Sequence, residues 1–113
     1  MPYLTVYTNV EFTNGEKLAE EASRLTADIL HKPVGYVVAN FIYNKSMAFG
    51  GSVTNKGALA ELKSIGLGDK DKFVAEMTAF LAIQLQLPNS QYINIALTDS
   101  PAAYTACNGR TFG

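Results

Sequence analysis

The second residue of this chain has the most distinctive chemistry. Pro2 follows Met1 directly, and a small residue there normally lets an aminopeptidase remove the methionine, which would leave a free secondary amine. An α-amino group titrates near ~8 in water, and apolar surroundings lower its pKa because they disfavour the charged form. A neutral proline nitrogen can then act as a general base at neutral pH. Many cytosolic chains begin Met-Pro without such a role, so the rest of the chain must support this interpretation.

The counts of cysteine and histidine exclude other kinds of chemistry. Cys107 is the only cysteine and His31 the only histidine, so one chain cannot assemble a zinc site of the usual Cys/His kind. It cannot form an internal disulfide and has no CxxC motif. His31 lies beside Lys32 at the end of a predicted helix, where a cation favourable to the helix dipole is its expected role. We expect no metal and no paired-thiol redox chemistry.

Length and charge indicate a single domain over residues 1–113 and exclude several partners. The 113 residues carry 9 Lys plus Arg against 10 Asp plus Glu, without a basic cluster, so neither nucleic acid nor an anionic membrane is an expected partner. No apolar stretch approaches the ~20 residues needed to span a bilayer. A basic segment followed by an apolar run is not visible at the N-terminus, so the expected location is cytoplasmic.

The first half of the sequence predicts a strand, a helix and a second strand. Thr13 and Glu16 have the spacing of a capping box, and the apolar residues that follow recur at helical intervals: Leu18, Ala22, Leu25 and Ile29. These signals predict a helix over about 14–31, ended by Pro33. Alternation at 3–8 and a run of β-branched and aromatic residues at 36–43 predict the strands.

The second half repeats this plan at a constant offset. Asp69 is a candidate helix cap, the apolar face comprises Val74, Met77, Leu81 and Leu85, and Pro88 precedes a predicted strand at 92–98. Tyr92 follows Tyr36, and Asp69 follows Thr13, by the same 56 residues, which indicates an internal duplication with halves of about 1–56 and 57–113. The duplication predicts a strand near Leu59, although 58–65 alone is as helical as it is extended.

Two such units predict an α+β fold in which a four-stranded sheet carries both helices on one face, a split βαβ arrangement. The other face then has no cover. Along 36–43 both alternating sets are apolar: Val37, Ala39 and Phe41 on one side, and Tyr36, Val38 and Ile42 on the other. A strand that is apolar on both sides requires cover on both sides. We therefore expect a homo-oligomer, in which another copy supplies the cover.

The duplicated plan and Pro2 together resemble the macrophage migration inhibitory factor family of the tautomerase superfamily, over essentially the whole chain. Several motifs carry the resemblance in the same order and spacing: Met1-Pro2, Thr8-Asn9-Val10, Lys32-Pro33 with Tyr36, Met47-Ala48-Phe49-Gly50-Gly51, Ser64-Ile65-Gly66, Tyr92-Ile93-Asn94 and Thr111-Phe112. Each motif alone is weak, but the set is specific. Tyr92 and Asn94 also favour this branch over the related D-dopachrome tautomerase.

The resemblance implies a fold, an assembly and a site. It implies a homotrimer of β-α-β-β-α-β subunits whose sheets form a barrel, with an active site at each subunit interface. By the family's pattern Pro2 is the catalytic base, Lys32 and the backbone N–H of Ile65 line its pocket, and Tyr92 and Asn94 enter from the neighbouring subunit. Further wall residues would be Tyr36 and Phe112. No metal or organic cofactor is implied.

These residue types suit keto–enol tautomerisation. The reaction of a small α-keto acid needs a base for the proton beside the carbonyl, a donor for the developing enolate oxygen and a cation for the carboxylate. Pro2, then Tyr92 or Asn94, and Lys32 can fill these roles. Covalent attack by the secondary amine is also possible chemistry, but the resemblance favours proton transfer. The two residues Tyr92 and Asn94 are two apart on a predicted strand and so would share one face.

Each residue also has a structural interpretation. Lys32 beside a helix-stopping proline is usually a solvated surface cation, and Tyr92 and Asn94 alone would be ordinary strand residues. Gly50-Gly51 suits a bulge or sharp bend, with no sign of a phosphate-binding loop. Phe49 is expected in the core or an interface.

The chain departs from the vertebrate cytokine of the family at several positions. Residues 57–60 read Gly-Ala-Leu-Ala where the cytokine has CxxC, so its thiol oxidoreductase activity is not expected. Cys107 and Thr105 replace a tryptophan and a valine, which predicts a less apolar pocket. Phe12 and Asn44 replace an arginine and an aspartate thought to engage a chemokine receptor, so receptor binding by that route is not expected.

Two functions follow from these observations. The first is a cofactor-independent isomerase of phenylpyruvate, hydroxyphenylpyruvate or dopachrome type that acts on a small α-keto acid or its enol. The second is a cytokine-like binding protein whose tautomerase activity is weak or vestigial. Retention of Pro2, Lys32, Ile65, Tyr92 and Asn94, together with loss of the thiols and the receptor residues, favours the enzyme.

Overall fold

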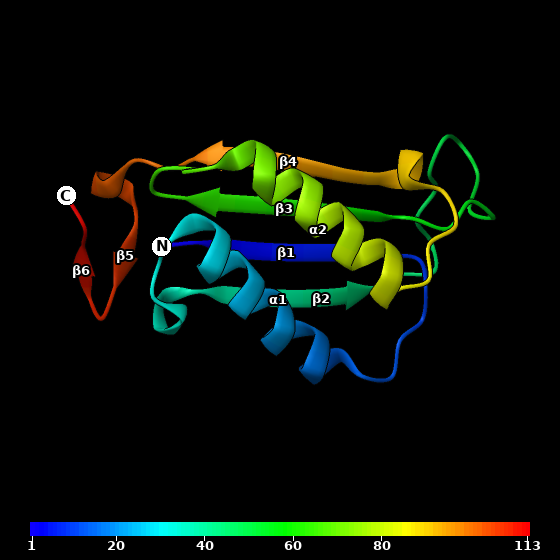
Figure 1. The fold of residues 1–113 in the computed structure, drawn as a ribbon, viewed down its shortest axis with the longest axis horizontal. Coiled ribbons are helices and arrows are strands. Elements are labelled where there is room, and N and C mark those ends of the chain that lie inside the picture. The colour runs from blue at the N-terminus through cyan, green and yellow to red at the C-terminus, as the bar shows by residue number, and fades with distance from the viewer.

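The chain folds into one four-stranded sheet with two helices packed on the same face (Figure 1). The computed structural model describes residues 1–113. Its main elements, in chain order, are β1 (Tyr3–Thr8), α1 (Gly15–Leu30), β2 (Val38–Tyr43), β3 (Ala58–Ser64), α2 (Lys70–Gln84) and β4 (Ile93–Asp99). The strand order is β2-β1-β3-β4. Parallel pairs β1/β2 and β3/β4 meet at the antiparallel pair β1/β3, which confirms the predicted split βαβ fold.

The internal duplication extends to the short turns that precede the outer strands. One 3-10 turn, η1 (Val34–Tyr36), leads into β2, and another, η2 (Ser90–Tyr92), leads into β4. Their bounds differ by the 56 residues seen in the sequence. The ambiguous segment near Leu59 forms β3, as the duplication predicts. Local helical propensity is overridden there because β1 and β4 supply pairing partners on both sides.

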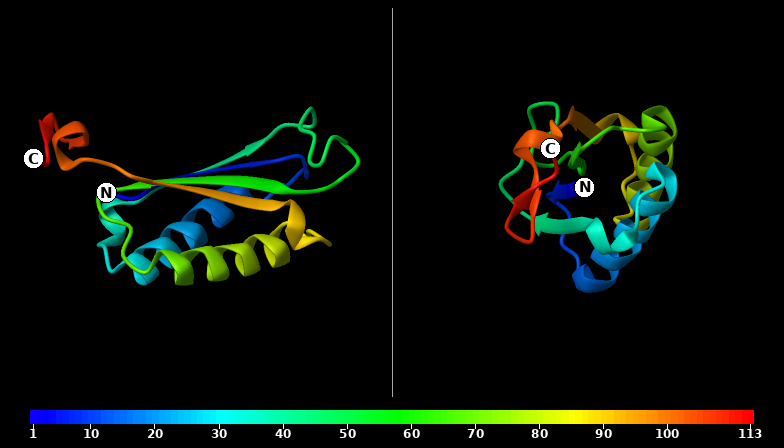
Figure 2. Two further views of the ribbon diagram at one scale, coloured as in Figure 1. Left: turned by 90° about the horizontal axis from the view of Figure 1, so that it is seen from above. Right: turned by 90° about the vertical axis from the view of Figure 1, so that its left-hand side faces the viewer.

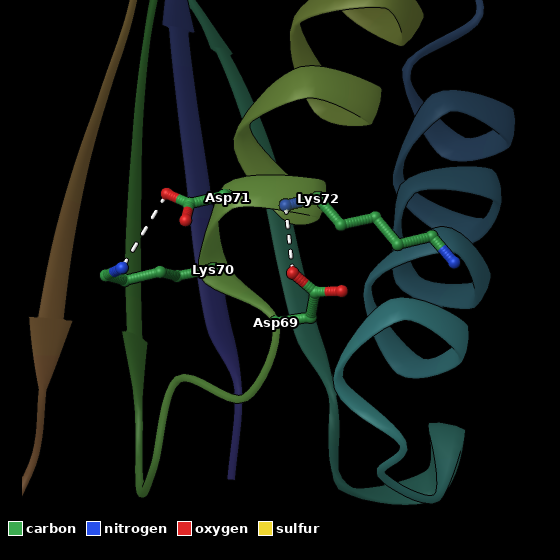
Figure 3. Close-up of polar contacts among 4 residues, drawn as sticks. All are labelled: Asp69, Lys70, Asp71 and Lys72. Carbon is green, nitrogen blue, oxygen red and sulfur yellow. Dashed lines mark hydrogen bonds and ion pairs between the residues drawn. The ribbon is translucent and has the colours of Figure 1, made fainter.

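The two helix starts differ in how they are capped. In α2 the Asp69 side chain accepts a hydrogen bond from the Lys72 backbone N–H at 3.2 Å, and Lys70 forms an ion pair with Asp71 at 3.6 Å (Figure 3). In α1 the N-cap is Asn14, whose side chain makes no capping hydrogen bond. The predicted Thr13 capping box is therefore wrong. Glu16 is the second residue of the helix, one position too early to complete such a box.

The core lies between the helices and the sheet. On α1 the predicted face holds, with Leu18, Ala22 and Ile29 buried and Leu25 half-buried. On α2 Met77 and Leu81 are buried as predicted, as is Leu85 at the C-cap, but Phe73 is fully buried and Val74 only half-buried. The α2 core face is therefore rotated toward the 73-77-81 row, whose members are four residues apart.

The opposite face of the sheet carries no helix (Figure 2). Val38 is 56% exposed and Ile42 36% exposed on this open face, as the alternation of β2 predicts. Its middle row is polar, because the register aligns Asn40, Thr5 and Glu61 across β2, β1 and β3. The open face thus combines exposed apolar residues on β2 with charged residues, Glu61 and Lys63, on β3.

A C-terminal arm extends beyond one end of the sheet (Figure 2). It consists of the 3-10 turn η3 (Ala102–Tyr104) and a two-stranded hairpin of β5 (Ala106–Cys107) and β6 (Arg110–Thr111). The Tyr3 hydroxyl donates to the Ala106 carbonyl at 3.3 Å, which ties the arm to β1.

Neither helix is long and apolar enough to cross a membrane.

Candidate active site

Pro2 is buried at the start of a central strand. It precedes β1 directly, its side chain is fully buried, and its carbonyl accepts a hydrogen bond from the Val38 N–H at 3.0 Å. The preceding Met1 is half-buried. Burial lowers the pKa of the Met1 amino group below its ordinary value, and the nearby positive charge of Lys32 lowers that pKa further. The start of the chain is therefore a place where an amine is easily deprotonated.

Lys32 reaches the same end of the sheet because of how α1 ends. His31 adopts a left-handed conformation with φ 55°, and the N–H groups of His31 and Lys32 both donate to the Ala27 carbonyl. The chain turns there, and the half-buried Lys32 side chain donates from Nζ to the Ile65 carbonyl at 3.2 Å. This bond fixes the ammonium group near the N-terminus.

Ile65 lies in a short loop held on both sides. The Ser100 N–H donates to the Ser64 carbonyl at 2.8 Å, and the Gly66 N–H donates to Asp99 Oδ1 at 2.9 Å. The Ile65 N–H makes no hydrogen bond within the subunit. A fixed and uncommitted N–H beside a lysine is suited to bind an anionic oxygen.

Tyr36 and Phe112 form an aromatic pair at this end. Their rings meet edge to face with centroids 6.4 Å apart and an interplanar angle of 87°. Phe112 is held by its backbone N–H, which donates to the carbonyls of Ala102 and Thr105 at 3.2 and 2.9 Å. Both rings remain partly exposed, at 47% and 42%. The structure thus brings Pro2, Lys32 and Ile65 to the end of the sheet where the pair lies.

Tyr92 and Asn94 lie at the other end of the sheet. The register places Asn94 beside Leu59 and Leu59 beside Tyr7, five residues along β1 from Pro2. At ~3.3 Å per residue this separates Asn94 from Pro2 by about 16 Å within one subunit. Tyr92 closes η2 and is not part of β4, so the prediction that both belong to one strand is wrong for Tyr92. Neither side chain makes a hydrogen bond within the subunit.

The chemistry available at the Pro2 end is that of a base, a cation and an N–H donor. None of the three surface hollows of the subunit is lined by Pro2, Lys32 or Ile65, so the subunit alone does not enclose this group. No group of three or more His, Cys, Asp or Glu side chains is arranged to hold a metal.

Sequence reasoning missed two buried polar residues that bear on the site. Asn9 is 3% exposed and makes four hydrogen bonds to the loop after β2. Ser64 is fully buried with no partner for its hydroxyl, and the register of β1 and β3, continued by one residue, places it opposite Pro2. Asn9 belongs to the motif Thr8-Asn9-Val10 and Ser64 to the motif Ser64-Ile65-Gly66. Nothing in the sequence shows that their side chains are buried.

The two replaced pocket residues differ in their surroundings. The Thr105 side chain is buried, and its hydroxyl donates to the Pro101 carbonyl at 2.9 Å. Cys107 is exposed in β5. The hydroxyl of Thr105 is therefore satisfied inside the arm.

Comparison with known proteins agrees with this architecture. The family model described as macrophage migration inhibitory factor matches residues 1–113. The macrophage migration inhibitory factor of Xenopus tropicalis is 32% identical over 117 residues, which cover 99% of both chains.

Solved structures give the same result. The crystal structure of a macrophage migration inhibitory factor homologue from Prochlorococcus marinus superimposes with a TM-score of 0.88 at 30% identity, covering 98% of this chain and 99% of that one. The Toxoplasma gondii macrophage migration inhibitory factor gives a TM-score of 0.86 at 27% identity, covering 97% and 99%. The chain therefore belongs to the macrophage migration inhibitory factor family.

Proposed function

We propose that this protein is a cofactor-independent tautomerase, either of the phenylpyruvate or hydroxyphenylpyruvate type, acting on a small aromatic α-keto acid or its enol, or of the dopachrome isomerase type. Its base would be the secondary amine of Pro2, exposed as the chain terminus once Met1 is removed. The observation that carries the proposal is the placement of buried Pro2 at the same end of the sheet as the fixed ammonium group of Lys32.

The surroundings of the terminus favour a neutral amine. Burial and the charge of Lys32 already lower the pKa of the amino group of Met1. After Met1 is lost, the terminal nitrogen would belong to Pro2, whose side chain is more deeply buried. Desolvation and a neighbouring cation would again disfavour the protonated form. A base that is largely neutral at pH 7 is suited to general base catalysis.

The proposed reaction moves one proton between carbon and oxygen. The neutral Pro2 nitrogen removes a proton from the carbon next to the carbonyl, and the C–H electrons form the carbon–carbon double bond of an enolate. The protonated amine then delivers its proton to the enolate oxygen and returns to the neutral form. Ketonisation is the same path in reverse. Lys32 and the free N–H of Ile65 bind the substrate carboxylate, and Tyr36 and Phe112 contact its aromatic ring.

The donor for the enolate oxygen would come from a neighbouring subunit. Tyr92 and Asn94 have uncommitted side chains but lie at the wrong end of the sheet to reach their own Pro2. The open sheet face, with Val38 at 56% exposure, and the unpaired edges of β2 and β4 offer surfaces for another copy. We propose a homotrimer in which each site combines the Pro2 end of one subunit with the Tyr92 end of the next.

The direct test is a phenylpyruvate tautomerase assay on the wild-type protein and the Pro2→Gly variant. Intact mass must first show that Met1 is absent from both. The variant should lose about 10²-fold or more in kcat/KM, because glycine offers an unconstrained primary amine in place of the secondary one. Light scattering should give three times the chain mass for both proteins. An unchanged rate in the variant would refute the role of Pro2, and a wild type without activity would favour the binding-protein alternative.

A further inference from the structure

The loop between β2 and β3 is tied together by a single buried amide. Asn9 Nδ2 donates to the carbonyls of Met47 at 3.1 Å and Asn55 at 2.8 Å, with a longer contact to Val53 at 3.5 Å. Its Oδ1 accepts the N–H of Gly57 at 3.1 Å. A buried side chain that uses both ends of its amide on one loop holds the two ends of that loop at a fixed separation.

The same loop contains a tight reversal at Gly50-Gly51. Phe49 and Ser52 exchange backbone hydrogen bonds of 3.1 and 3.2 Å across it. Both glycines have positive φ, 59° and 85°, as a type I′ turn requires. Asn55 secures the turn by donating from Nδ2 to the Phe49 carbonyl at 2.8 Å.

This turn lies directly against the ring of Tyr92. A β-carbon added at Gly50 would come within 3.0 Å of Tyr92 Cε1 and 3.3 Å of its hydroxyl oxygen. At the other end of the tyrosine, a β-carbon added at Gly57 would overlap the Tyr92 carbonyl oxygen and approach its Cβ at 2.9 Å. The tyrosine is therefore enclosed between two glycines that allow the backbone to approach closely. Its hydroxyl makes no hydrogen bond, so packing alone sets its direction.

We infer that Asn9 and Gly50 are positioning residues for Tyr92. Asn9 holds the loop, the loop presents Gly50 against the ring, and the ring is thereby preorganised to point its hydroxyl at a ligand. The inference rests on the proposed function, in which Tyr92 serves the site of the neighbouring subunit. It adds that the direction of this donor depends on a loop that carries none of the residues assigned to the site. Preorganised donors favour transition-state binding because they need no rearrangement during the reaction.

Two neighbouring glycines give a matched pair of variants. Gly50→Ala places a methyl group against the Tyr92 ring, whereas Gly51→Ala has no atom within 4 Å of the added carbon. Both positions have positive φ, so the backbone strain of an alanine is present in each. In the phenylpyruvate assay Gly50→Ala should lower kcat/KM by about tenfold, while Gly51→Ala should stay within about twofold of wild type. Equal losses in the two variants would overturn the inference.

A double-mutant cycle separates positioning from general destabilisation. Gly50→Ala should have little further effect on kcat/KM in a Tyr92→Phe background, because the hydroxyl that it displaces is already absent. Additive losses would contradict the inference. The same test applies to Asn9→Asp, which keeps an acceptor for Gly57 but removes the amide N–H donors.

An activity-independent measurement distinguishes failure of the inference from failure of the proposed function. The ring signals of Tyr92 can be assigned by NMR from their loss in Tyr92→Phe. Gly50→Ala should shift them and Gly51→Ala should not. Unmoved signals in Gly50→Ala would overturn the positioning role of Gly50 even if the enzyme is active. Shifted signals in a protein that has no tautomerase activity would support the positioning role and refute the proposed function.

Discussion

Tyr36 and Tyr92 close equivalent 3-10 turns 56 residues apart, and they lie at opposite ends of the same sheet. The relationship follows from the duplication, because β1 and β3 run antiparallel and each is followed by the same sequence of elements. One end of each subunit therefore presents Tyr36 with Pro2, and the other presents Tyr92 with Asn94. Under the proposed function, these two ends are the complementary halves of a site shared between subunits.

This geometry predicts complementation between two inactive variants. Pro2→Gly subunits and Tyr92→Phe/Asn94→Ala subunits should each have little activity alone. Mixed trimers formed by joint refolding should regain roughly a quarter of wild-type activity, because random assembly pairs an intact Pro2 with an intact neighbour in that fraction of sites. The measurement is the tautomerase rate of the mixture. Equimolar homotrimers combined without subunit exchange are the control, and a refolded mixture as inactive as this control would contradict the shared site.

Lys32 should control the pH dependence of the reaction. Its positive charge lowers the pKa of the Met1 amino group. The same charge would act on the Pro2 amine once Met1 is removed, so Lys32→Gln should raise the pKa of that amine. A smaller fraction of the amine is then neutral at a given pH, and the rise of kcat/KM with pH should move to higher pH. Lys32→Arg keeps the charge and should keep the midpoint near that of wild type, although carboxylate binding changes. Identical midpoints in all three proteins would show that Lys32 does not act on the base.

The edge-to-face contact of Tyr36 and Phe112 predicts a preference for aromatic substrates. Replacing Phe112 by leucine removes the proposed contact between its ring and the aromatic ring of the substrate. Such a contact is worth about 0.5–1.5 kcal/mol, so KM for phenylpyruvate should rise by roughly threefold to tenfold. Turnover of an aliphatic α-keto acid should change little. The ratio of kcat/KM for the two substrates tests this directly. Equal effects on both would indicate that Phe112 holds the C-terminal arm in place and does not contact the substrate ring.

The caps of the two helices give a stability prediction that is independent of catalysis. Asp69→Ala removes the bond to the Lys72 N–H and should lower the free energy of unfolding by about 1 kcal/mol per subunit. Asn14→Ala, at an N-cap whose side chain makes no such bond, should cost less. Denaturant titrations compare the two. Neither variant should change kcat/KM, since neither side chain makes a hydrogen bond to a residue assigned to the site. A larger loss in Asn14→Ala would contradict the assignment of the caps.

Much of the fold could be predicted from the sequence because the signals repeat. The 56-residue offset identified β3 near Leu59 where local propensity was ambiguous, and it related the two helices and outer strands. What failed was local detail. The capping box at Thr13 has the right residues, but α1 begins one position later than that motif requires. Phe73 is buried and Val74 is not fully buried. The sequence could not predict this, because it depends on the angle at which α2 packs on the sheet.

For the candidate site too, some residues could be predicted from the sequence, but their local conformations and contacts could not. Pro2 could be singled out by its type and position, and Lys32 through the family resemblance, and the structure brings them to one end of the sheet. The 3-10 turns before β2 and β4 were not visible, because Tyr36 and Tyr92 look like strand residues. The sequence indicates Asn9 only as a member of the motif Thr8-Asn9-Val10. Its role depends on carbonyls more than thirty residues away, which only the folded loop brings within reach.

The central claim is that the Pro2 nitrogen is a free amine whose pKa lies below that of an ordinary α-amino group. A titration of protein labelled with ¹⁵N-proline, in which intact mass shows that Met1 is absent, measures that nitrogen directly. We predict a midpoint below the ~8 of an ordinary α-amino group, matching the midpoint at which kcat/KM rises with pH. A midpoint at or above the ordinary value, or full activity in protein that retains Met1 and so has an amide at this position, would contradict the account.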